Sequence, residues 1–284
     1  MPLLRLADRV HDLECRALVM GVLNRTPDSF FDRGSTFDLD ALIWRADQLV
    51  RDGADVLDVG GVKAGPGPNV DEGEELERVV PAIEALRERF DVPLSVDTWR
   101  ASVLDAACRA GAVLGNDISG FRDPQYLPTA ARCDASVVAT HIRLRPRVAD
   151  PDPHYDDVVN EVTTFLLERA GQAEAAGLAP DQILLDAGLD LGKTAAQSAV
   201  LLRESAALAS HGYALLLSAS NKPFLGELLG LSLEERRDAS LAAVAYGVVR
   251  GCRVVRVHDV AGTVRVCRMI EALLELARYG ERVG

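Results

Sequence analysis

In eight places along this 284-residue chain, a short apolar run is followed by a longer amphipathic stretch. The runs occupy residues 17–23, 56–59, 94–96, 113–114, 136–139, 183–185, 214–217 and 253–257, and helical patterns lie near 39–52, 72–90, 100–110, 123–133, 156–176, 195–210, 232–250 and 261–279. Several runs are apolar on both faces, which is typical of parallel strands covered by helices. Eight such units without a linker favour one (β/α)8 TIM barrel over a doubly wound sheet. We therefore predict an α/β fold, with residues 1–284 in a single barrel domain and residues 1–16 as its N-terminal cap.

The acidic balance of the chain limits its partners. Its formal net charge is −12 at pH 7. Proteins that coat nucleic acids or bind anionic membranes need a broad basic face, so we expect neither partner. A small anionic substrate is still possible, because a few local cations can hold one phosphate inside an acidic protein.

Cysteine usage and the N-terminal residues favour a cytoplasmic protein. The five cysteines are odd in number and include no C-x-x-C pair, so we expect reduced thiols without zinc or disulfides. Charges at Arg5, Asp8 and Arg9 interrupt any signal-peptide core. The apolar runs have the length of strands, and none is long enough to span a membrane.

Polar residues follow every predicted strand, and in a (β/α)8 barrel the loops after the strands build the active site. In chain order these residues are Asn24, Asp28, Asp58, Asp97, Asn116, Asp117, His141, Asp186, Ser220, Asn221, Lys222, Arg256, His258 and Asp259. Any single aspartate could instead be a helix N-cap, because Asp between a strand and a helix is a favoured cap. Polar ends on all eight strands nevertheless predict a binding or active site at this rim.

The rim residues divide into two chemical groups. One group could converge on a flat heterocycle, because carboxylates accept paired N–H donors and an amide offers one donor and one acceptor: Asp97, Asn116, Asp186 and Lys222. The other group suits an oxyanion or a metal-bound phosphate: Asn24, Arg256 and His258.

Several motifs resemble those of the dihydropteroate synthase family. Residues 20–30 read MGVLNRTPDSF, close to the family's first signature M-G-[IV]-[LI]-N-x-T-P-D-S-F. The start of the second signature is similar to LDVGG at residues 57–61. Further matches follow in order at SVDT (95–98), NDI (116–118), His141, LLD (184–186), GK (192–193) and RVHDV (256–260). The resemblance extends from residue 17 to about residue 275.

This resemblance implies a fold, a reaction and a set of site residues. The family forms a (β/α)8 barrel and joins p-aminobenzoate to the methylene group of a dihydropterin, releasing pyrophosphate. By resemblance, the pterin would bind to Asp97, Asn116, Asp186 and Lys222. The pyrophosphate would lie against Asn24, Arg256 and His258, and Asn24 would hold its Mg²⁺. Of these residues, the resemblance assigns catalytic roles to Lys222, Arg256 and His258.

The resemblance also implies a homodimer, because the family pairs through its last helices. Residues 241–249 are apolar on more than one helical face, which a monomer would have to expose or bury entirely.

The second signature departs from the family pattern. Gly-Gly-Glu-Ser-Thr-Arg-Pro-Gly is replaced by GGVKAGPG at residues 60–67. Gly65 stands where the family has an arginine that meets the pyrophosphate, and Ala64 replaces a threonine beside the aminobenzoate site. Lys63 and Arg25 could supply compensating charge, so Lys63 is added to the predicted anion site.

Other departures fall in neighbouring loops. Residues 186–193 read DAGLDLGK instead of DPGFGFGK, which introduces the acidic Asp190, and Asn221 replaces a second arginine. After the fifth strand, Arg143, Arg145 and Arg147 stand at alternate positions. They could face one side of an extended segment and form a new anion site, or they could belong to a solvated loop.

The leading hypothesis is a dihydropteroate-synthase-like protein that keeps a pterin and pyrophosphate pocket but has very weak or no synthase activity. We expect Mg²⁺ to be its cofactor, bound only together with pyrophosphate. One alternative is an active synthase with compensating loops. Others are a related barrel enzyme for another anionic substrate and a non-catalytic pterin-binding module.

Overall fold

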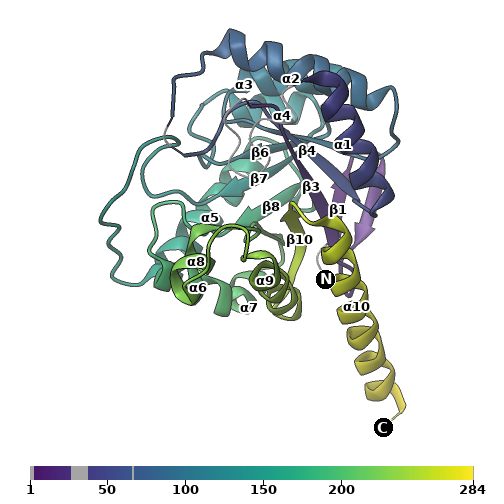
Figure 1. The fold of residues 1–284 in the computed structure, drawn as a ribbon, viewed down its shortest axis with the longest axis vertical. Helices are drawn as coiled ribbons and strands as arrows, with labels where there is room; N and C mark the ends of the chain where they lie inside the picture. The colour runs from purple at the N-terminus through teal and green to yellow at the C-terminus, as the bar shows by residue number, and fades with distance from the viewer. Residues whose placement is uncertain (1–2, 27–37, 66, 284) are drawn as a thin grey trace.

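Eight parallel strands close into a barrel, as the sequence predicts (Figure 1). The computed structural model describes residues 3–26, 38–65 and 67–283, with side chains in the last helix described as far as Ala277. The order around the barrel is β10-β3-β4-β5-β6-β7-β8-β9. The strands are β3 (Leu18–Asn24), β4 (Val56–Gly60), β5 (Leu94–Asp97), β6 (Leu114–Asp117), β7 (Ser136–Thr140), β8 (Ile183–Asp186), β9 (Ala214–Leu217) and β10 (Cys252–Val257).

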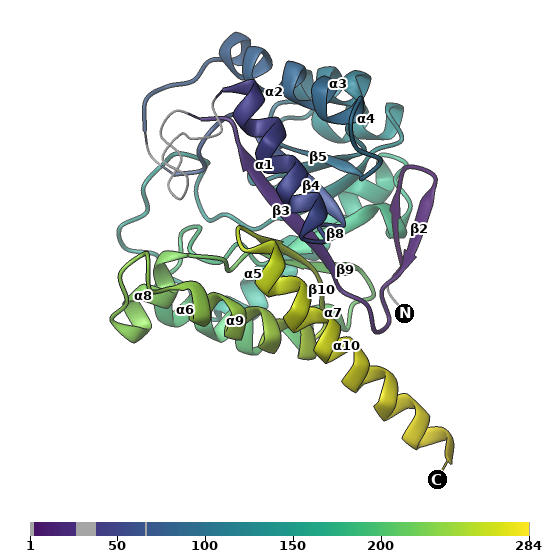
Figure 2. The same ribbon diagram turned by 45° about the vertical axis from the view of Figure 1, so that its right-hand side comes forward.

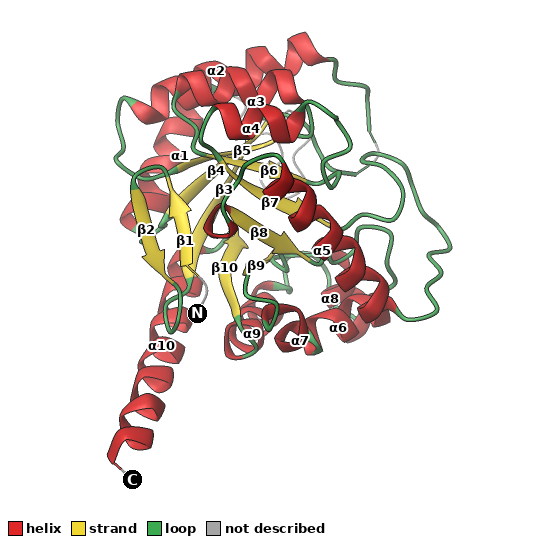
Figure 3. Cartoon of the chain, turned by 180° about the vertical axis from the view of Figure 1, so that it is seen from behind, coloured by secondary structure: helices red, strands yellow, loops and turns green. Residues whose placement is uncertain are grey.

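Helices cover the outside of the barrel (Figure 3). They are α1 (Leu39–Arg51), α2 (Glu72–Arg87), α3 (Ala101–Ala110), α4 (Tyr126–Arg132), α5 (Val158–Ala175), α6 (Ala195–Arg203), α7 (Ser205–Ala209), α8 (Pro223–Leu229), α9 (Arg237–Val249) and α10 (Val260–Val283), with a 3-10 turn at Pro180–Gln182. The stretch predicted as one helix at 195–210 divides at Glu204 into α6 and α7. The sequence analysis missed α8, whose seven residues are too few for a helical period to stand out.

An N-terminal hairpin packs against the amino-terminal end of the barrel. It consists of β1 (Leu3–Leu6) and β2 (Arg9–Asp12), paired antiparallel. Leu4, Leu6 and Leu13 are almost fully buried, in one cluster with inward-facing barrel residues such as Met20 and Leu184. Burial of such side chains stabilises a fold by roughly 1.5–3 kcal/mol each, so this hairpin helps to close the end of the barrel opposite the site.

The strand alternation determines which residues face the barrel interior. In β4, Val56 belongs to the inner cluster, whereas Leu57 and Val59 pack outward against the helices. Asp58, two residues after Val56, therefore shares the inner face. The apolar cluster fills the amino-terminal half of the barrel, which leaves the carboxyl-terminal rim to polar side chains.

Within the described residues, no helix has the length and apolar composition needed to cross a membrane. All five cysteines are free thiols.

Candidate functional site

The inward direction of four strands brings the predicted rim residues together. In β6, β8 and β10, the inner-cluster residues Leu114, Leu184 and Val254 each precede a polar residue by two positions. Those polar residues are Asn116, Asp186 and Arg256, and Asp97 follows Ser95 in the same way on β5. Because successive side chains on a strand alternate between faces, all four point toward the barrel axis.

Asp58 is the centre of a buried hydrogen-bond network at this rim. Its Oδ1 accepts a bond from the Ser95 hydroxyl at 2.5 Å, and its Oδ2 accepts one from the Asn116 amide at 3.1 Å. The Arg256 Nε donates to the same Oδ2 at 2.6 Å. The Asp58 side chain has no solvent exposure, so these three donors stabilise its buried charge. Asp58 thereby orients two of the predicted site residues.

Arg256 is shared between two carboxylates. Besides Asp58, it donates from a terminal nitrogen to Asp97 Oδ2 at 2.8 Å. Burial, together with the nearby Asp58 charge, raises the pKa of Asp97 to about 7, although Arg256 acts in the opposite direction. Burial and the neighbouring Asp58 charge outweigh the attraction of Arg256, so Asp97 holds its proton more tightly than an ordinary aspartate.

Asp186 and Lys222 complete the same interior. Asp186 Oδ1 accepts a hydrogen bond from the Gly188 amide at 2.8 Å, and Lys222 Nζ donates to the Leu189 carbonyl at 2.6 Å. Burial raises the pKa of Asp186 and lowers that of Lys222, while the charge of each partly counters the shift of the other. Arg256 also lowers both pKa values, so the charges of the Asp58 network influence the Asp186–Lys222 pair. The structure thus gathers the four residues predicted for a heterocycle.

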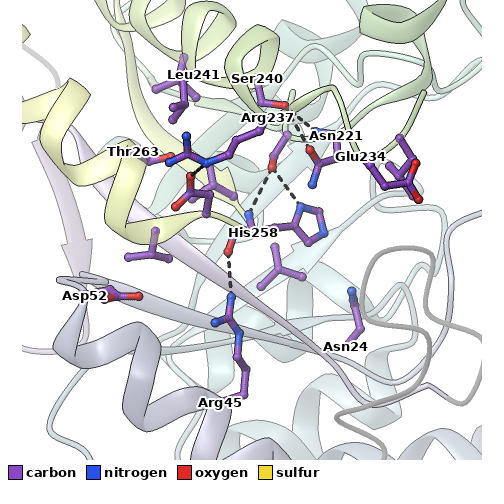
Figure 4. A pocket seen from close by; sticks show the side chains of 17 residues that line it. Asn24, Arg45, Asp52, Asn221, Glu234, Arg237, Ser240, Leu241, His258 and Thr263 are labelled. Carbon is purple, nitrogen blue, oxygen red and sulfur yellow. Dashed lines mark hydrogen bonds and ion pairs between the residues drawn. The ribbon is translucent and has the colours of Figure 1, made fainter. Parts of the chain in front are cut away.

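A separate cavity of about 660 Å³ lies beside β3, β9 and β10 (Figure 4). Its lining includes Asn24 and His258 of the predicted anion group, together with Ser220, Arg45 and Arg237. His258 Nδ1 lies 3.0 Å from the Ser220 hydroxyl, and Arg45 donates to the His258 carbonyl at 2.9 Å. Asp97, Asn116, Asp186 and Lys222 do not line this cavity.

Arg256 belongs to the buried network around Asp58. The sequence analysis grouped it with Asn24 and His258 for anion binding, but its guanidinium is held by Asp58 and Asp97. The reason is strand alternation, because Arg256 faces the barrel axis, where it pairs with Asp58. Arg256 therefore links the two groups.

Two of the departures from the family pattern, and one of the proposed compensating charges, have structural explanations. Asp190 has a φ of 67° and turns its carboxylate toward α8, where Oδ2 accepts the Phe224 amide at 3.1 Å. Its charge is thus directed at the helix N-terminus, which is a favourable position for an anion. Asn221 also has a positive φ, and its backbone N–H donates to Ser240 Oγ at 2.9 Å. Arg25 donates to the carbonyl of Arg78 on α2 at 2.7 Å, which uses part of the charge expected to compensate in the second signature.

Of the two alternatives for the three arginines, the extended one-sided face is not formed, and the segment is a loop. The segment turns at Arg147, whose φ is 66°, and is not extended. Arg143 pairs with Asp150 at 2.6 Å, Arg145 is exposed, and Arg147 donates to the backbone of the loop after β4. The alternation argument failed because it requires continuous β geometry.

Sequence reasoning gave too little weight to Lys193. Its buried Nζ lies 2.8 Å from His141 Nδ1 and donates to the carbonyls of Gly188 at 2.9 Å and Leu191 at 3.1 Å. Burial lowers the pKa of Lys193 to about 7, and burial with the Lys193 charge lowers the pKa of His141 to about 3. Gly188 has a φ of 64°, and a Cβ there would lie 1.9 Å from the His141 carbonyl oxygen. Lys193 therefore holds the loop that follows Asp186 at the end of β8.

The other residue missed is Asp58, which the sequence analysis placed on the rim but not in the site. The signal that could have found it is its inward position two residues after Val56 on a strand next to β5.

Metal binding by the protein alone has little support in the parts of the chain that can be described. There, no group of three His, Cys, Asp or Glu side chains is arranged to hold an ion. Asn24 offers a neutral amide oxygen at the end of β3, and one such ligand suits an ion that brings other oxygen ligands with it. Asp28, the other polar residue predicted after β3, lies outside the described residues.

Comparison with known proteins agrees with this geometry. Residues 20–258 match the family model described as pterin binding enzyme. The protein named inactive dihydropteroate synthase 2 of Mycobacterium leprae is 44% identical over 264 residues, which cover 91% of each chain. The structure of Yersinia pestis dihydropteroate synthase with a sulfonamide drug has a TM-score of 0.92 and 37% identity, covering 96% of this chain and 99% of that one.

A further structure, Xanthomonas albilineans dihydropteroate synthase in complex with 7,8-dihydropteroate, has a TM-score of 0.82 and 38% identity over 96% of this chain and 98% of that chain. Both the family match and these relatives confirm the resemblance drawn from the motifs. The chain therefore belongs to the pterin binding enzyme family and is a dihydropteroate synthase-like member of it.

Proposed function

We propose that this chain binds a pterin through its inner rim residues and catalyses dihydropteroate formation very weakly or not at all. The observation that carries the proposal is a contrast between two parts of the rim. The Asp58–Asp97–Asn116–Arg256 network is complete, whereas the loop after β4 has Gly65 where the family has an arginine.

The pterin part of the proposal is supported by the donors and acceptors inside the barrel. Asp97 and Asp186 offer carboxylate oxygens to the N–H edge of a heterocycle, and Asn116 offers an amide. Lys222 supplies a cation that also lies near Asp186. The solved relative with 7,8-dihydropteroate has the same fold at 38% identity, which supports the same ligand class here.

The loss of activity is supported by the contacts of the charged side chains around the second signature, which are made within the protein. Arg25 and Arg147 donate to backbone carbonyls, and Asp190 is directed to the start of α8. A hydrogen bond to a charged group is typically worth about 1.5–3 kcal/mol, so losing one on the departing pyrophosphate slows the reaction roughly 10- to 150-fold. The relative from Mycobacterium leprae, which carries the name inactive, supports this assignment at 44% identity.

Roles for the remaining rim residues follow from the same proposal. Asn24, His258 and Lys63 would face the pyrophosphate, and Lys222, Arg256 and His258 would be the groups that contact the reacting atoms. Mg²⁺ would enter with the pyrophosphate and be held in part by Asn24, and its chemistry would be to neutralise the charge of the leaving group.

The protein would be a homodimer in the cytoplasm. Helix α10 projects away from the barrel (Figures 1 and 2), and it exposes Met269, Leu273 and Leu276 by 53–66%. Tyr246 and Val249 on α9 are 43% and 59% exposed. A second copy of the chain would cover this apolar surface. The free cysteines suit the reducing conditions of the cytoplasm.

The experiment that tests pterin binding is calorimetric titration of the purified chain with a dihydropterin. We expect measurable binding by the unaltered chain and a loss of at least tenfold in affinity for Asp97→Asn. Asp150→Asn is the matched control, because Asp150 pairs with Arg143 and takes no part in the Asp58–Asp97–Asn116–Arg256 network. Absence of binding, or equal affinity in Asp97→Asn, would contradict the proposal.

A further inference from the structure

The loop after β4 is fixed by arginines from three different elements. Arg78 on α2 donates to the Gly61 carbonyl at 2.8 Å, near the start of the loop. Arg100, just before α3, donates to the Val70 carbonyl at 2.8 Å, at its end. The middle of the loop is held by Arg147, which comes from the loop after β7.

Arg147 contacts the middle of this loop at three carbonyl groups. Its backbone amide donates to Ala64 at 3.1 Å, and one terminal nitrogen donates to Lys63 at 3.2 Å. The other terminal nitrogen donates to the Pro68 carbonyl. A guanidinium presents its donors in a fixed planar fork, so one side chain can hold two points of the same loop.

The contact spans one sector of the barrel rim. In the strand order, β5 and β6 lie between β4 and β7. A junction between the loops after β4 and β7 therefore reaches past the ends of β5 and β6, which carry Asp97 and Asn116. The ribbon views show these two loops meeting on the same side of the barrel (Figures 1 and 2).

We propose that Arg147 is a positioning residue that straps the described loop residues 61–65 and 67–70 across the β5–β6 sector, and that release of this strap controls entry of a heterocycle to Asp97 and Asn116. The first half depends only on the contacts above. The second half rests on the proposed pterin function. The strap also gives a role to the arginine segment after the fifth strand, which the reaction of the family does not require.

The chain offers an unusually specific test of the strap. It contains only three lysines, Lys63, Lys193 and Lys222, so a lysine-specific protease has three possible sites. Lys63 lies in the strapped loop, the Lys193 side chain is buried, and Lys222 precedes Pro223, a residue that hinders cleavage. Cleavage after Lys63 therefore reports local opening of the loop, and cleavage after Lys193 reports wider unfolding.

The experiment follows both cleavages by mass spectrometry in the full-length protein and in Arg147→Ala. We expect cleavage after Lys63 to be at least tenfold faster in Arg147→Ala, with cleavage after Lys193 unchanged. The control is Arg145→Ala, which removes an exposed arginine two residues away and should match the unaltered protein. Equal rates after Lys63, or parallel acceleration at both lysines, would overturn the strap.

Entry of the heterocycle is measured separately, by stopped-flow association of a dihydropterin. We expect a faster association rate constant for Arg147→Ala than for Arg145→Ala. An equal or slower rate would overturn the gating role while leaving the protease result intact. Absence of binding to any form would instead count against the proposed pterin function, so the two failures are distinguishable.

Discussion

Removal of the Arg256 guanidinium should destabilise the fold in a pH-dependent way. Arg256 forms ion pairs with Asp58 at 2.6 Å and Asp97 at 2.8 Å, and these three side chains are 17%, 0% and 13% exposed. Removing one partner from a buried pair typically costs about 3–5 kcal/mol, because the remaining charge is left buried without compensation. We therefore expect Arg256→Met to lower the free energy of unfolding by about 3–5 kcal/mol at pH 8.5, which is above the pKa of Asp97.

At lower pH the cost should shrink. The pKa of Asp97 is raised to about 7, so the group favours its protonated form in the folded chain and its contribution to stability is lost as pH rises through that value. At pH 5.5 Asp97 is largely neutral and needs no cation. The loss in Arg256→Met should then fall to about half of its value at pH 8.5, because Asp97 no longer carries a charge that Arg256 compensates.

The assay is urea unfolding followed by tryptophan fluorescence, with each variant compared with the unaltered chain at the same pH. Arg256→Met combined with Asp58→Asn is the matched control, since it removes a carboxylate charge together with its partner and should recover part of the stability. A loss below about 1 kcal/mol at pH 8.5, typical of exposed pairs, would refute the reasoning. An equal loss at both pH values would refute it as well.

Three further predictions follow from other parts of the structure. Asp190→Ala should lower the free energy of unfolding by about 1–2 kcal/mol in the same urea assay, because it removes the acceptor for the Phe224 amide, whereas Asp190→Asn should cost much less. Since burial lowers the pKa of Lys193 to about 7, neutral Lys193 contributes stability at high pH that declines as pH falls toward 7. Relative to Lys193→Met, the unaltered chain should therefore lose up to about 1.4 kcal/mol per pH unit between pH 9.5 and 7.5, and equal slopes would contradict this. Leu273→Glu with Leu276→Glu should convert a dimer to a monomer in sedimentation velocity at micromolar concentration, and a monomeric unaltered chain would contradict the dimer.

The sequence predicted the barrel because its signal is local and repeated. Each strand is a short apolar run, and several end in a polar residue that alternation turns inward, as Asp97 and Asp186 illustrate. Helix α8 left no such signal, since it is a single short segment beginning at Pro223.

The partners of individual side chains were harder to predict. Asp58 orients Asn116 and Arg256 through contacts between strands distant in sequence, so no local sequence pattern predicts these contacts. The positive φ values of Arg147 and Asp190 are likewise imposed by tertiary contacts, because non-glycine residues rarely adopt them. The sequence located the rim and its chemistry, and the structure supplied the pairing.

Restoring the family's threonine and arginine at residues 64 and 65 offers the most direct test of the functional assignment. Among the described residues, a Cβ at Gly65 would meet only the Lys63 side chain, at 3.9 Å, so a side chain can begin there without displacing backbone. The measurement is kcat/KM for dihydropteroate formation by the unaltered chain and by Ala64→Thr with Gly65→Arg, with the Yersinia pestis synthase assayed alongside. We predict that the unaltered chain is at least about 100-fold below that enzyme, and that the double variant gains at least tenfold. An unaltered chain with a kcat/KM within a few-fold of the Yersinia pestis synthase would contradict the account.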